Sequence, residues 1–132
     1  MKKLPKISDA EWQILKELWS NSPVTANKII ENLSNHSNWK PRTIKTLISR
    51  LVKKGAVGYE IDKKDNRTYH YFPLVDKEQC VKAESQSFLK KVYNGSFNMM
   101  VAKLIEEQEL SQQEIDELKQ ILNQKKSERD EK

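Results

Sequence analysis

The stretch that decides the fold is Trp39-Lys-Pro-Arg-Thr-Ile-Lys-Thr-Leu-Ile-Ser-Arg-Leu-Val-Lys-Lys-Gly55. Pro41 suits the first position of a helix, because its missing N–H costs nothing there and its fixed φ is already helical. Gly55 suits the position after a helix, and Lys53 and Lys54 carry the charge that the carboxyl end of a helix favours. The sequence therefore predicts a helix that begins at Pro41 and ends before Gly55.

This predicted helix has two unlike faces. Aliphatic residues recur at i, i+3, i+4 and i+7 and form one apolar stripe, Ile44, Leu47, Ile48 and Leu51. The other side has no carboxylate and carries Arg42, Lys45, Thr46, Ser49 and Lys53. In the major groove of DNA, Arg and Lys bind guanine or phosphate, while Thr and Ser reach base edges or methyl groups. An ordinary amphipathic surface helix would also show two faces, so the flanking sequence decides.

Two more helices are predicted upstream. Ser8-Asp-Ala-Glu11 has the pattern of a capping box, in which each of the two end residues caps the backbone N–H of the other. The helix that follows has a broad apolar face and extends to about Ser20. Thr25 can cap a second, shorter helix over residues 26–34.

After the third helix, the apolar period changes from 3.6 to 2. Residues 57–61 alternate, and residues 68–72 form a second β-prone run rich in aromatic side chains. The polar loop between them holds three cations, so a hairpin with a basic tip is predicted. We expect the cations of this tip to contact the DNA backbone, with a merely solvated turn as the alternative; they are Lys63, Lys64 and Arg67.

Three helices within about fifty residues, followed by a hairpin, is the order of a winged helix-turn-helix, in which the third helix enters the major groove. We predict a mostly α chain with a small β-hairpin. Residues 1–73 would form the winged-helix DNA-binding domain and residues 74–132 a three-helix dimerisation domain. The predicted DNA contacts, with Arg50 at the edge of the face as a phosphate contact, are Lys40, Arg42, Thr43, Lys45, Thr46, Ser49, Arg50, Lys53, Lys63, Lys64 and Arg67.

The charge is unevenly distributed along the chain. Residues 1–73 hold 14 Lys+Arg and 7 Asp+Glu, whereas residues 74–132 hold 10 and 12, for a net charge of +5 overall. A basic first half and a weakly acidic second half indicate that only the first half meets a polyanion, and double-stranded DNA is the predicted partner.

The second half is predicted to be helical throughout. Residues 75–93 carry a sparse apolar stripe, and Asn94-Gly95 ends it. A dense stripe follows, and Ser111-Gln-Gln-Glu114 is a second capping box at the start of the last helix. The charged tail, residues 124–132, is expected to fray.

Only 59 residues make up this half, too few for three short helices to be stable alone. The hydrophobic content of 36% is also low for one compact domain. We therefore predict a two-fold homodimer that would read a palindrome with two recognition helices; packing back onto the winged helix in a monomer is the alternative. The predicted interface comprises Phe88, Leu89, Val92, Phe97, Met100, Val101, Leu104, Ile105, Ile115, Leu118, Ile121 and Leu122.

The tryptophans and the paired tyrosines of the second β-run are predicted to pack in the core. Stacking of Trp12, Trp19 and Trp39 on a ligand is the weaker alternative. Tyr69 and Tyr71 share a strand face, and we favour core packing over base stacking for both.

The sequence shows no sign of an enzyme, a cofactor or a metal site. Cys80 is the only cysteine, and His36 and His70 have no partner at ligand spacing. No nucleophile motif or phosphate-binding loop is present. The basic start has no apolar run after it, and no segment approaches the ~20 apolar residues of a membrane span, so we expect a cytoplasmic protein with no membrane insertion.

The assembled pattern resembles the penicillinase repressor family, the BlaI/MecI-type regulators. The resemblance covers nearly the full length and is carried by Ile7-Ser-Asp-Ala-Glu-Trp12, Trp39-Lys-Pro-Arg-Thr-Ile-Lys-Thr-Leu47, Arg50-Leu-Val-Lys-Lys-Gly55, Ser87-Phe-Leu-Lys-Lys-Val-Tyr-Asn-Gly95 with Phe97-Asn98, and Leu110-Ser-Gln-Gln-Glu-Ile115. It implies a homodimeric repressor of palindromic operators before β-lactamase or penicillin-resistance genes. It also implies relief by proteolysis, triggered by a membrane β-lactam sensor.

Two positions depart from the family pattern. Members commonly have Ser before the Pro of the third helix, and here the residue is Lys40, a poor cap that can approach a phosphate. The best-known members are cut at an Asn-Phe bond, and the aligned pair here is Lys103-Leu104, the candidate cleavage site for a sensor-linked protease. Two alternatives stay open: a repressor of the same family that controls non-β-lactam genes, and a winged helix used for protein–protein assembly.

Overall fold

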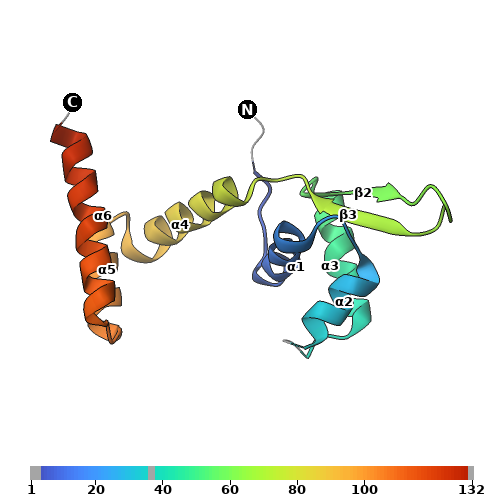
Figure 1. Cartoon of the computed structure of the whole chain (residues 1–132), viewed down its shortest axis with the longest axis horizontal. Coiled ribbons are helices and arrows are strands. Elements are labelled where there is room, and N and C mark those ends of the chain that lie inside the picture. The colour runs from blue at the N-terminus through green and yellow to red at the C-terminus, as the bar shows by residue number, and fades with distance from the viewer. Residues whose placement is uncertain (1–3, 36–37, 131–132) are drawn as a thin grey trace. The chain divides into compact units, whose positions relative to one another are not determined.

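The structure of the chain is a computed structural model that describes residues 4–35 and 38–130 (Figure 1). It is mostly helical with one small sheet, which confirms the predicted fold class. In chain order the elements are α1 (Asp9–Asn21), β1 (Val24–Thr25), α2 (Ala26–Ser34), α3 (Pro41–Lys53), β2 (Val57–Ile61), β3 (Tyr69–Pro73), α4 (Lys77–Tyr93), α5 (Phe97–Glu107) and α6 (Gln112–Asp130).

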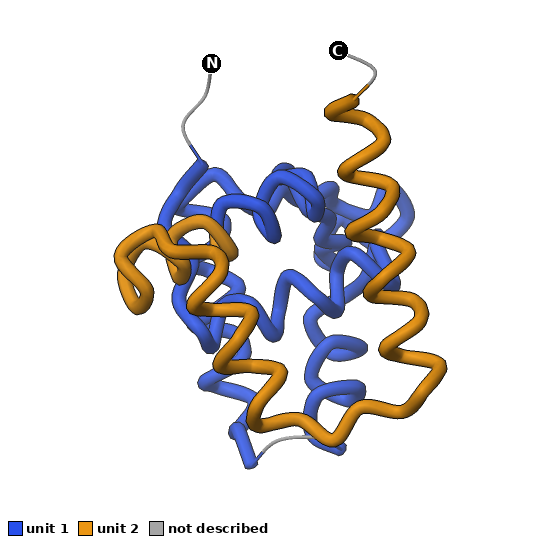
Figure 2. The backbone as a smooth tube through the Cα atoms, turned by 90° about the vertical axis from the view of Figure 1, so that its left-hand side faces the viewer, with its two compact units in different colours: residues 1–83 blue, residues 84–132 orange. Residues whose placement is uncertain are grey.

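The chain divides into two compact units, residues 1–83 and residues 84–132, drawn in blue and orange in Figure 2. The first unit contains α1, α2, α3, the three strands and the first turns of α4. The second unit contains the rest of α4 together with α5 and α6. The predicted domain boundary after residue 73 lies earlier, before α4, and stays a prediction.

The core of the first unit joins the apolar faces of its three complete helices. α3 lies against α1, α2 and β2. The four stripe residues of α3 are all buried, which confirms the predicted pattern and removes their apolar surface from water. The buried core consists of Ile14, Leu15, Leu18, Val24, Ile29, Leu33, Ile44, Leu47, Ile48, Leu51, Ala56 and Val57.

The sheet is antiparallel, with strand order β1-β3-β2. β2 and β3 form the predicted hairpin, and Tyr59 lies opposite Tyr71. β3 begins at Tyr69, one residue later than the β-prone run. The short strand β1 pairs with β3, placing Val24 opposite Tyr71, and this pairing was not predicted.

Both predicted caps at the start of the chain are present. The Ser8 N–H donates to Glu11 Oε1 over 2.9 Å, and the Glu11 N–H donates to Ser8 Oγ over 3.2 Å. Thr25 Oγ1 accepts from the Lys28 N–H over 3.2 Å at the start of α2. These local bonds satisfy N–H groups that have no partner within their own helix.

The second unit contrasts with the first because its described part forms no buried core. Among the described residues 84–130, no side chain is buried. The three helical segments are well formed, and Ser111 and Glu114 make the second capping box through two bonds of 3.1 Å. Over these same residues, no two helices pack extensively on each other.

Two helix ends differ from the sequence expectation. α4 begins at Lys77 instead of residue 75, because Asp76 precedes it and its Oδ2 accepts from the Gln79 N–H over 3.1 Å. α6 is helical as far as Asp130, where fraying from residue 124 was expected. Residues 124–130 contain no Gly or Pro and consist mainly of good helix formers, which explains why the helix extends.

Candidate DNA-binding surface

The outward face of α3 is the first candidate surface. Because the apolar stripe turns inward, the predicted contact residues of α3 are exposed. Four of them line one shallow hollow, which we call the recognition face: Arg42, Lys45, Thr46 and Ser49. No carboxylate lines this hollow, so it presents only positive charge and hydroxyl groups. The three other predicted contact residues of α3 are exposed but lie outside the hollow; they are Thr43, Arg50 and Lys53.

One hydroxyl of the recognition face is already engaged. Thr46 Oγ1 donates its hydrogen to the Arg42 carbonyl oxygen over 2.9 Å. In this state Thr46 offers its methyl group and oxygen lone pairs outward, but no donor. The methyl of thymine and the amino groups of adenine and cytosine are the base-edge groups that such a side chain matches.

The two ends of α3 are held differently. At its start, Lys40 is exposed and its side chain makes no capping bond, as predicted. At its end, Lys54 Nζ donates to Glu11 Oε1 over 2.5 Å and to the Lys6 carbonyl oxygen over 2.8 Å. Lys54 therefore ties the end of the recognition helix to the start of α1.

Glu11 is buried, with 1% of its surface exposed. Burial by itself would raise the pKa of Glu11, but the hydrogen bonds from Lys54 and Ser8 outweigh it and hold the pKa below its ordinary value. The sequence identified Glu11 only as a capping residue. Its partner Lys54 lies 43 positions away, and no local pattern links the two.

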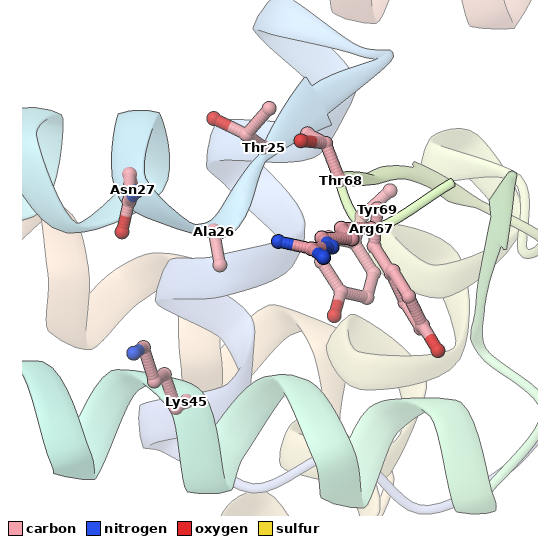
Figure 3. Close-up of a pocket in the computed structure, with 8 residues that line it drawn as sticks. Thr25, Ala26, Asn27, Lys45, Arg67, Thr68 and Tyr69 are labelled. Carbon is pink, nitrogen blue, oxygen red and sulfur yellow. The ribbon is translucent and has the colours of Figure 1, made fainter. Parts of the chain in front are cut away.

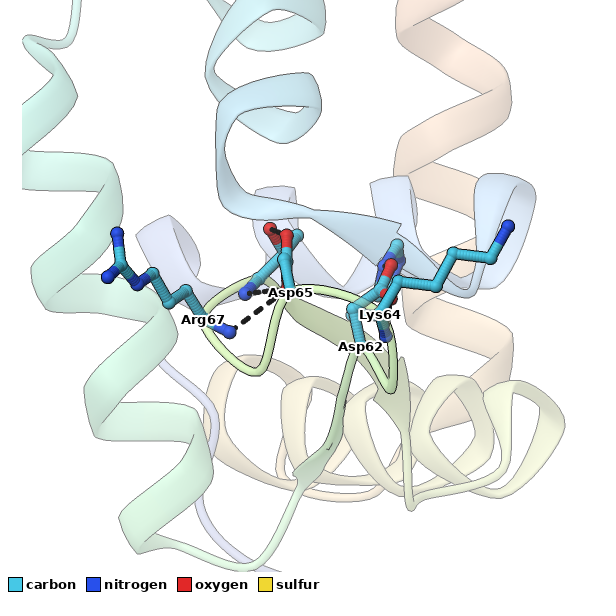
Figure 4. Close-up of polar contacts among 6 residues, drawn as sticks. Asp62, Lys64, Asp65 and Arg67 are labelled. Carbon is cyan, nitrogen blue, oxygen red and sulfur yellow. Dashed lines mark hydrogen bonds and ion pairs between the residues drawn. The ribbon is translucent and has the colours of Figure 1, made fainter.

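We call the hairpin of β2 and β3 the wing, and the loop of residues 62–68 its tip. The two carboxylates of the tip accept hydrogen bonds from groups of the tip itself (Figure 4). Asp65 Oδ1 accepts from the N–H groups of Arg67 and Thr68 over 2.9 and 3.0 Å, and its Oδ2 accepts from the Thr68 hydroxyl. Asp62 Oδ1 accepts from the Lys64 N–H over 2.8 Å. The hydrogen bond from the Thr68 side chain and those from the two N–H groups lower the pKa of Asp65 to about 2.

The three wing cations are exposed, but their side chains do not all extend in the same direction. In Figure 4 the Arg67 side chain extends toward α3, whereas Lys64 extends to the opposite side of the turn. Arg67 is therefore the wing cation that the fold brings next to the recognition helix. Lys63 and Lys64 line neither the hollow of the recognition face nor the second hollow that is described next.

A second hollow, which we call the wing hollow, lies among the start of α2, the middle of α3 and the side of the wing formed by residues 67–71 (Figure 3). It brings together Lys45 and Arg67, which are 22 positions apart in the sequence. No carboxylate lines it. The lining residues are Thr25, Ala26, Asn27, Lys45, Arg67, Thr68, Tyr69 and Tyr71.

The tyrosines of the wing correct one sequence expectation. Tyr71 is half-buried and packs against the core, as predicted. Tyr69 is 39% exposed and stacks instead on Tyr59, which is 45% exposed, with ring centroids 4.8 Å apart. Core packing was therefore wrong for Tyr69, because β3 extends beyond the helices that cover Tyr71.

The tryptophans pack as expected. Trp19 and Trp39 are partly buried against the core. Trp12 packs edge-to-face on Trp19, with centroids 5.5 Å apart. Trp19 Nε1 also donates to the Val75 carbonyl oxygen over 3.0 Å, which holds the chain just before α4.

The described part of the chain offers neither a metal site nor a membrane-spanning helix. His36 lies outside the described residues, and His70 Nε2 lies 3.4 Å from Asp62 Oδ2. In residues 4–35 and 38–130 no group of three or more His, Cys, Asp and Glu could hold a metal ion. Within the same ranges no helix combines the length and apolar character needed to cross a membrane.

A basic, carboxylate-free third helix on a helical core, with a wing beside it, defines a winged-helix DNA-binding protein. Comparison with known proteins narrows this class. Residues 7–124 match the family model of the penicillinase repressor. The chain therefore belongs to the penicillinase repressor family, a family of transcriptional repressors and not of enzymes, as the sequence predicted.

Individual relatives agree with this assignment. The penicillinase repressor of Bacillus licheniformis is 42% identical over 127 residues, which cover 96% of this chain and 97% of that protein. The methicillin resistance regulatory protein MecI of Staphylococcus aureus strain N315 is 42% identical over 91% of this chain and 95% of its own. The solution structure of monomeric B. licheniformis BlaI with the blaP half-operator matches at TM-score 0.51 and 41% identity, covering 59% of this chain and 92% of that one.

Proposed function

We propose that the chain is a homodimeric transcriptional repressor that binds a palindromic operator in the cytoplasm. The genes that it controls would be those of a β-lactamase or of penicillin resistance, because its relatives are a penicillinase repressor and a methicillin resistance regulator. The observation that carries the proposal is the recognition face, which presents cations and hydroxyls without a carboxylate on a helix whose back is fully packed.

Direct readout is assigned to the recognition face. Arg42 lies in the first turn of α3, the part of a recognition helix that contacts base edges, and Arg can bind guanine through two hydrogen bonds. Lys40, Arg50, Lys53 and the wing cations would contact phosphates, fixing the register without reading sequence. Each phosphate contact releases counterions, so the total affinity should fall steeply with salt.

The dimer is assigned to the second unit. Its apolar side chains are unburied within one chain; Phe97, Ile121 and Leu122 are 55%, 63% and 63% exposed. Exposed apolar area of this extent on helices is relieved when a second copy covers it. The proposed interface remains the full predicted set: Phe88, Leu89, Val92, Phe97, Met100, Val101, Leu104, Ile105, Ile115, Leu118, Ile121 and Leu122.

Relief of repression would follow from cutting the second unit. The candidate bond, Lys103-Leu104, lies inside α5, and both residues are exposed. Lys103 Nζ lies 3.7 Å from Glu106 Oε2 on the next turn. A protease linked to a sensor would need to unwind this turn first, and the cut would then divide the proposed interface.

A titration of DNA binding tests the function. Fluorescence anisotropy at near-physiological salt would compare a palindrome from upstream of the protein's own gene with a scrambled duplex of equal length. We expect the palindrome to be preferred by ~10³-fold or more, with two chains per site. Equal weak binding to this and to other candidate promoters would contradict the proposal and favour a protein-assembly role.

A further inference from the structure

The wing carries an exposed aromatic stack that neither the core nor the proposed base readout uses. Tyr59 and Tyr69 stack at an interplanar angle of 17° on adjacent strands. Their register neighbours Tyr71 and Ile61 share the same strand face, and Ile61 is also 45% exposed. On this face of the hairpin, Tyr71 packs against the core. Nearer the tip, the side chains form an exposed and largely aromatic surface.

The aromatic surface continues into the wing hollow. Tyr69 and Tyr71 form part of its wall, and Lys45 and Arg67 also line it (Figure 3). Burial, together with the two neighbouring tyrosines, raises the pKa of Tyr71, so its hydroxyl keeps its hydrogen at neutral pH. The hollow thus combines two cations, a hydroxyl donor and aromatic surface.

The two carboxylates near the wing hollow already accept hydrogen bonds from other groups of the wing. Asp65 accepts hydrogen bonds from the turn itself, and Asp62 accepts from the Lys64 N–H and lies beside His70. Neither carboxylate lines the hollow. The charge complement of this hollow is accordingly an anion that enters from outside.

We propose that the wing hollow and the Tyr59–Tyr69 stack together bind one backbone phosphate of duplex DNA and the deoxyribose attached to it. This inference rests on the proposed function, because it takes DNA as the occupant. Arg67 and Lys45 bind the phosphate, and the exposed tyrosine rings pack against the sugar. Within the recognition face, Lys45 then contacts the backbone and the other three residues read bases. Since Lys45 belongs to α3 and Arg67 to the wing, a shared phosphate fixes the recognition helix in one register.

An acidic protein is the other occupant to consider. The core of a protein–protein interface is depleted of charged residues, although aromatic side chains and Arg are enriched there. Here two cations and no carboxylate line the hollow beside the aromatic surface. The hollow also shares Lys45 with the recognition face, where the backbone of a bound duplex would pass. Charge complementarity and continuity with the recognition face therefore favour the DNA backbone.

The test is a scan of operator duplexes that each carry one neutral methylphosphonate in place of a phosphate. Full-length wild type, Arg67→Ala and Lys64→Ala would be compared by fluorescence anisotropy. We expect one phosphate per half-site whose neutralisation weakens the wild type by at least about tenfold, the scale of a charged hydrogen bond. Arg67→Ala should reduce the effect of neutralisation at that position several-fold, because only Lys45 still binds the phosphate there. Lys64→Ala removes the same charge from the opposite side of the turn and should leave its sensitivity intact.

The tyrosines are tested on the same duplexes. Tyr69→Leu and Tyr59→Leu should each lower operator affinity several-fold, while Tyr69→Phe, which keeps the ring, should lose less. Circular dichroism and thermal unfolding check that each variant folds. If the wild type prefers the operator but no phosphate loses sensitivity in Arg67→Ala, or neither leucine variant loses affinity, the proposal is overturned and the proposed function stands. If the wild type shows no operator preference, both fail.

Discussion

The two units of the chain are built from the same kind of amphipathic helix, and both begin helices with a Ser-x-x-Glu capping box. In residues 1–83 the apolar side chains meet in a buried core. In the described residues 84–130, side chains of equal hydrophobicity stay at least partly exposed, and none is buried. The same helix-start signal thus occurs in both units, but among the described residues neighbouring elements bury the apolar side chains extensively in the first unit alone.

This contrast separates two functions of apolar surface. In the first unit it holds α3 rigidly, with Glu11 and Lys54 fixing its far end, so that the recognition face has a defined shape. In the second unit it remains available to another molecule. The proposed repressor would use the first kind to read one half-site and the second kind to join two readers.

The largest expected effect is on the core of the first unit. Leu51 is completely buried on α3, so Leu51→Ala should lower the free energy of unfolding by about 3 kcal/mol. All three tryptophans lie in residues 1–83, so urea unfolding followed by tryptophan fluorescence reports on this unit alone. A loss below about 1 kcal/mol would show that the packing around α3 is looser than described.

The next effect should come from the second unit. Ile121→Asp places a charge in the proposed interface, and we expect it to yield monomers by sedimentation and to weaken operator binding by at least ~100-fold. Its tryptophan-monitored unfolding midpoint should change little. Asn123→Asp adds the same charge at an exposed polar position and serves as the control. A dimeric Ile121→Asp would contradict the interface.

A smaller effect distinguishes two arginines within the first unit. Arg42→Ala should weaken binding to the operator about tenfold more than binding to random duplex, because Arg42 is assigned to base readout. Arg50→Ala should weaken both duplexes equally, because Arg50 is assigned to phosphate. Anisotropy titrations on both duplexes measure the difference. Equal losses in Arg42→Ala would make it a phosphate contact too.

The smallest expected effect is on the wing, which lies largely outside the core of the first unit. The stability of its tip should depend on pH through Asp65. The pKa of Asp65 falls from 3.8 to about 2 when its hydrogen bonds form. Because the folded pKa is the lower one, the stabilisation of the turn is complete above pH 3.8 and is lost as the pH falls toward 2. Amide chemical shifts of Arg67 and Thr68 should titrate with a midpoint near 2. A midpoint near 3.8 would show that these bonds are absent.

How much the sequence could predict depended on the distance between the residues involved. The stripe of α3 and both capping boxes follow from spacings of three and four residues, and all were predicted. The ion pair of Glu11 with Lys54, the pairing of β1 with β3 and the meeting of Lys45 with Arg67 join segments far apart, so no local pattern contains them.

The misassigned tyrosine illustrates another limit. A period of two correctly placed Tyr69 and Tyr71 on one face of a strand. It contains no information on how far along the strand the covering helices extend, and the cover ends between these two residues. For this reason Tyr59 and Tyr69, which we propose as sugar contacts, were not among the DNA contacts predicted from the sequence.

The most direct test of the central claim, that the first unit reads DNA and the second unit pairs two readers, compares the full chain with a fragment of residues 1–83. Both would be titrated at fixed salt onto the palindromic operator and onto a half-operator. We predict equal affinities for the half-operator and an advantage of at least ~100-fold for the full chain on the palindrome. Equal affinities on both duplexes would contradict the account.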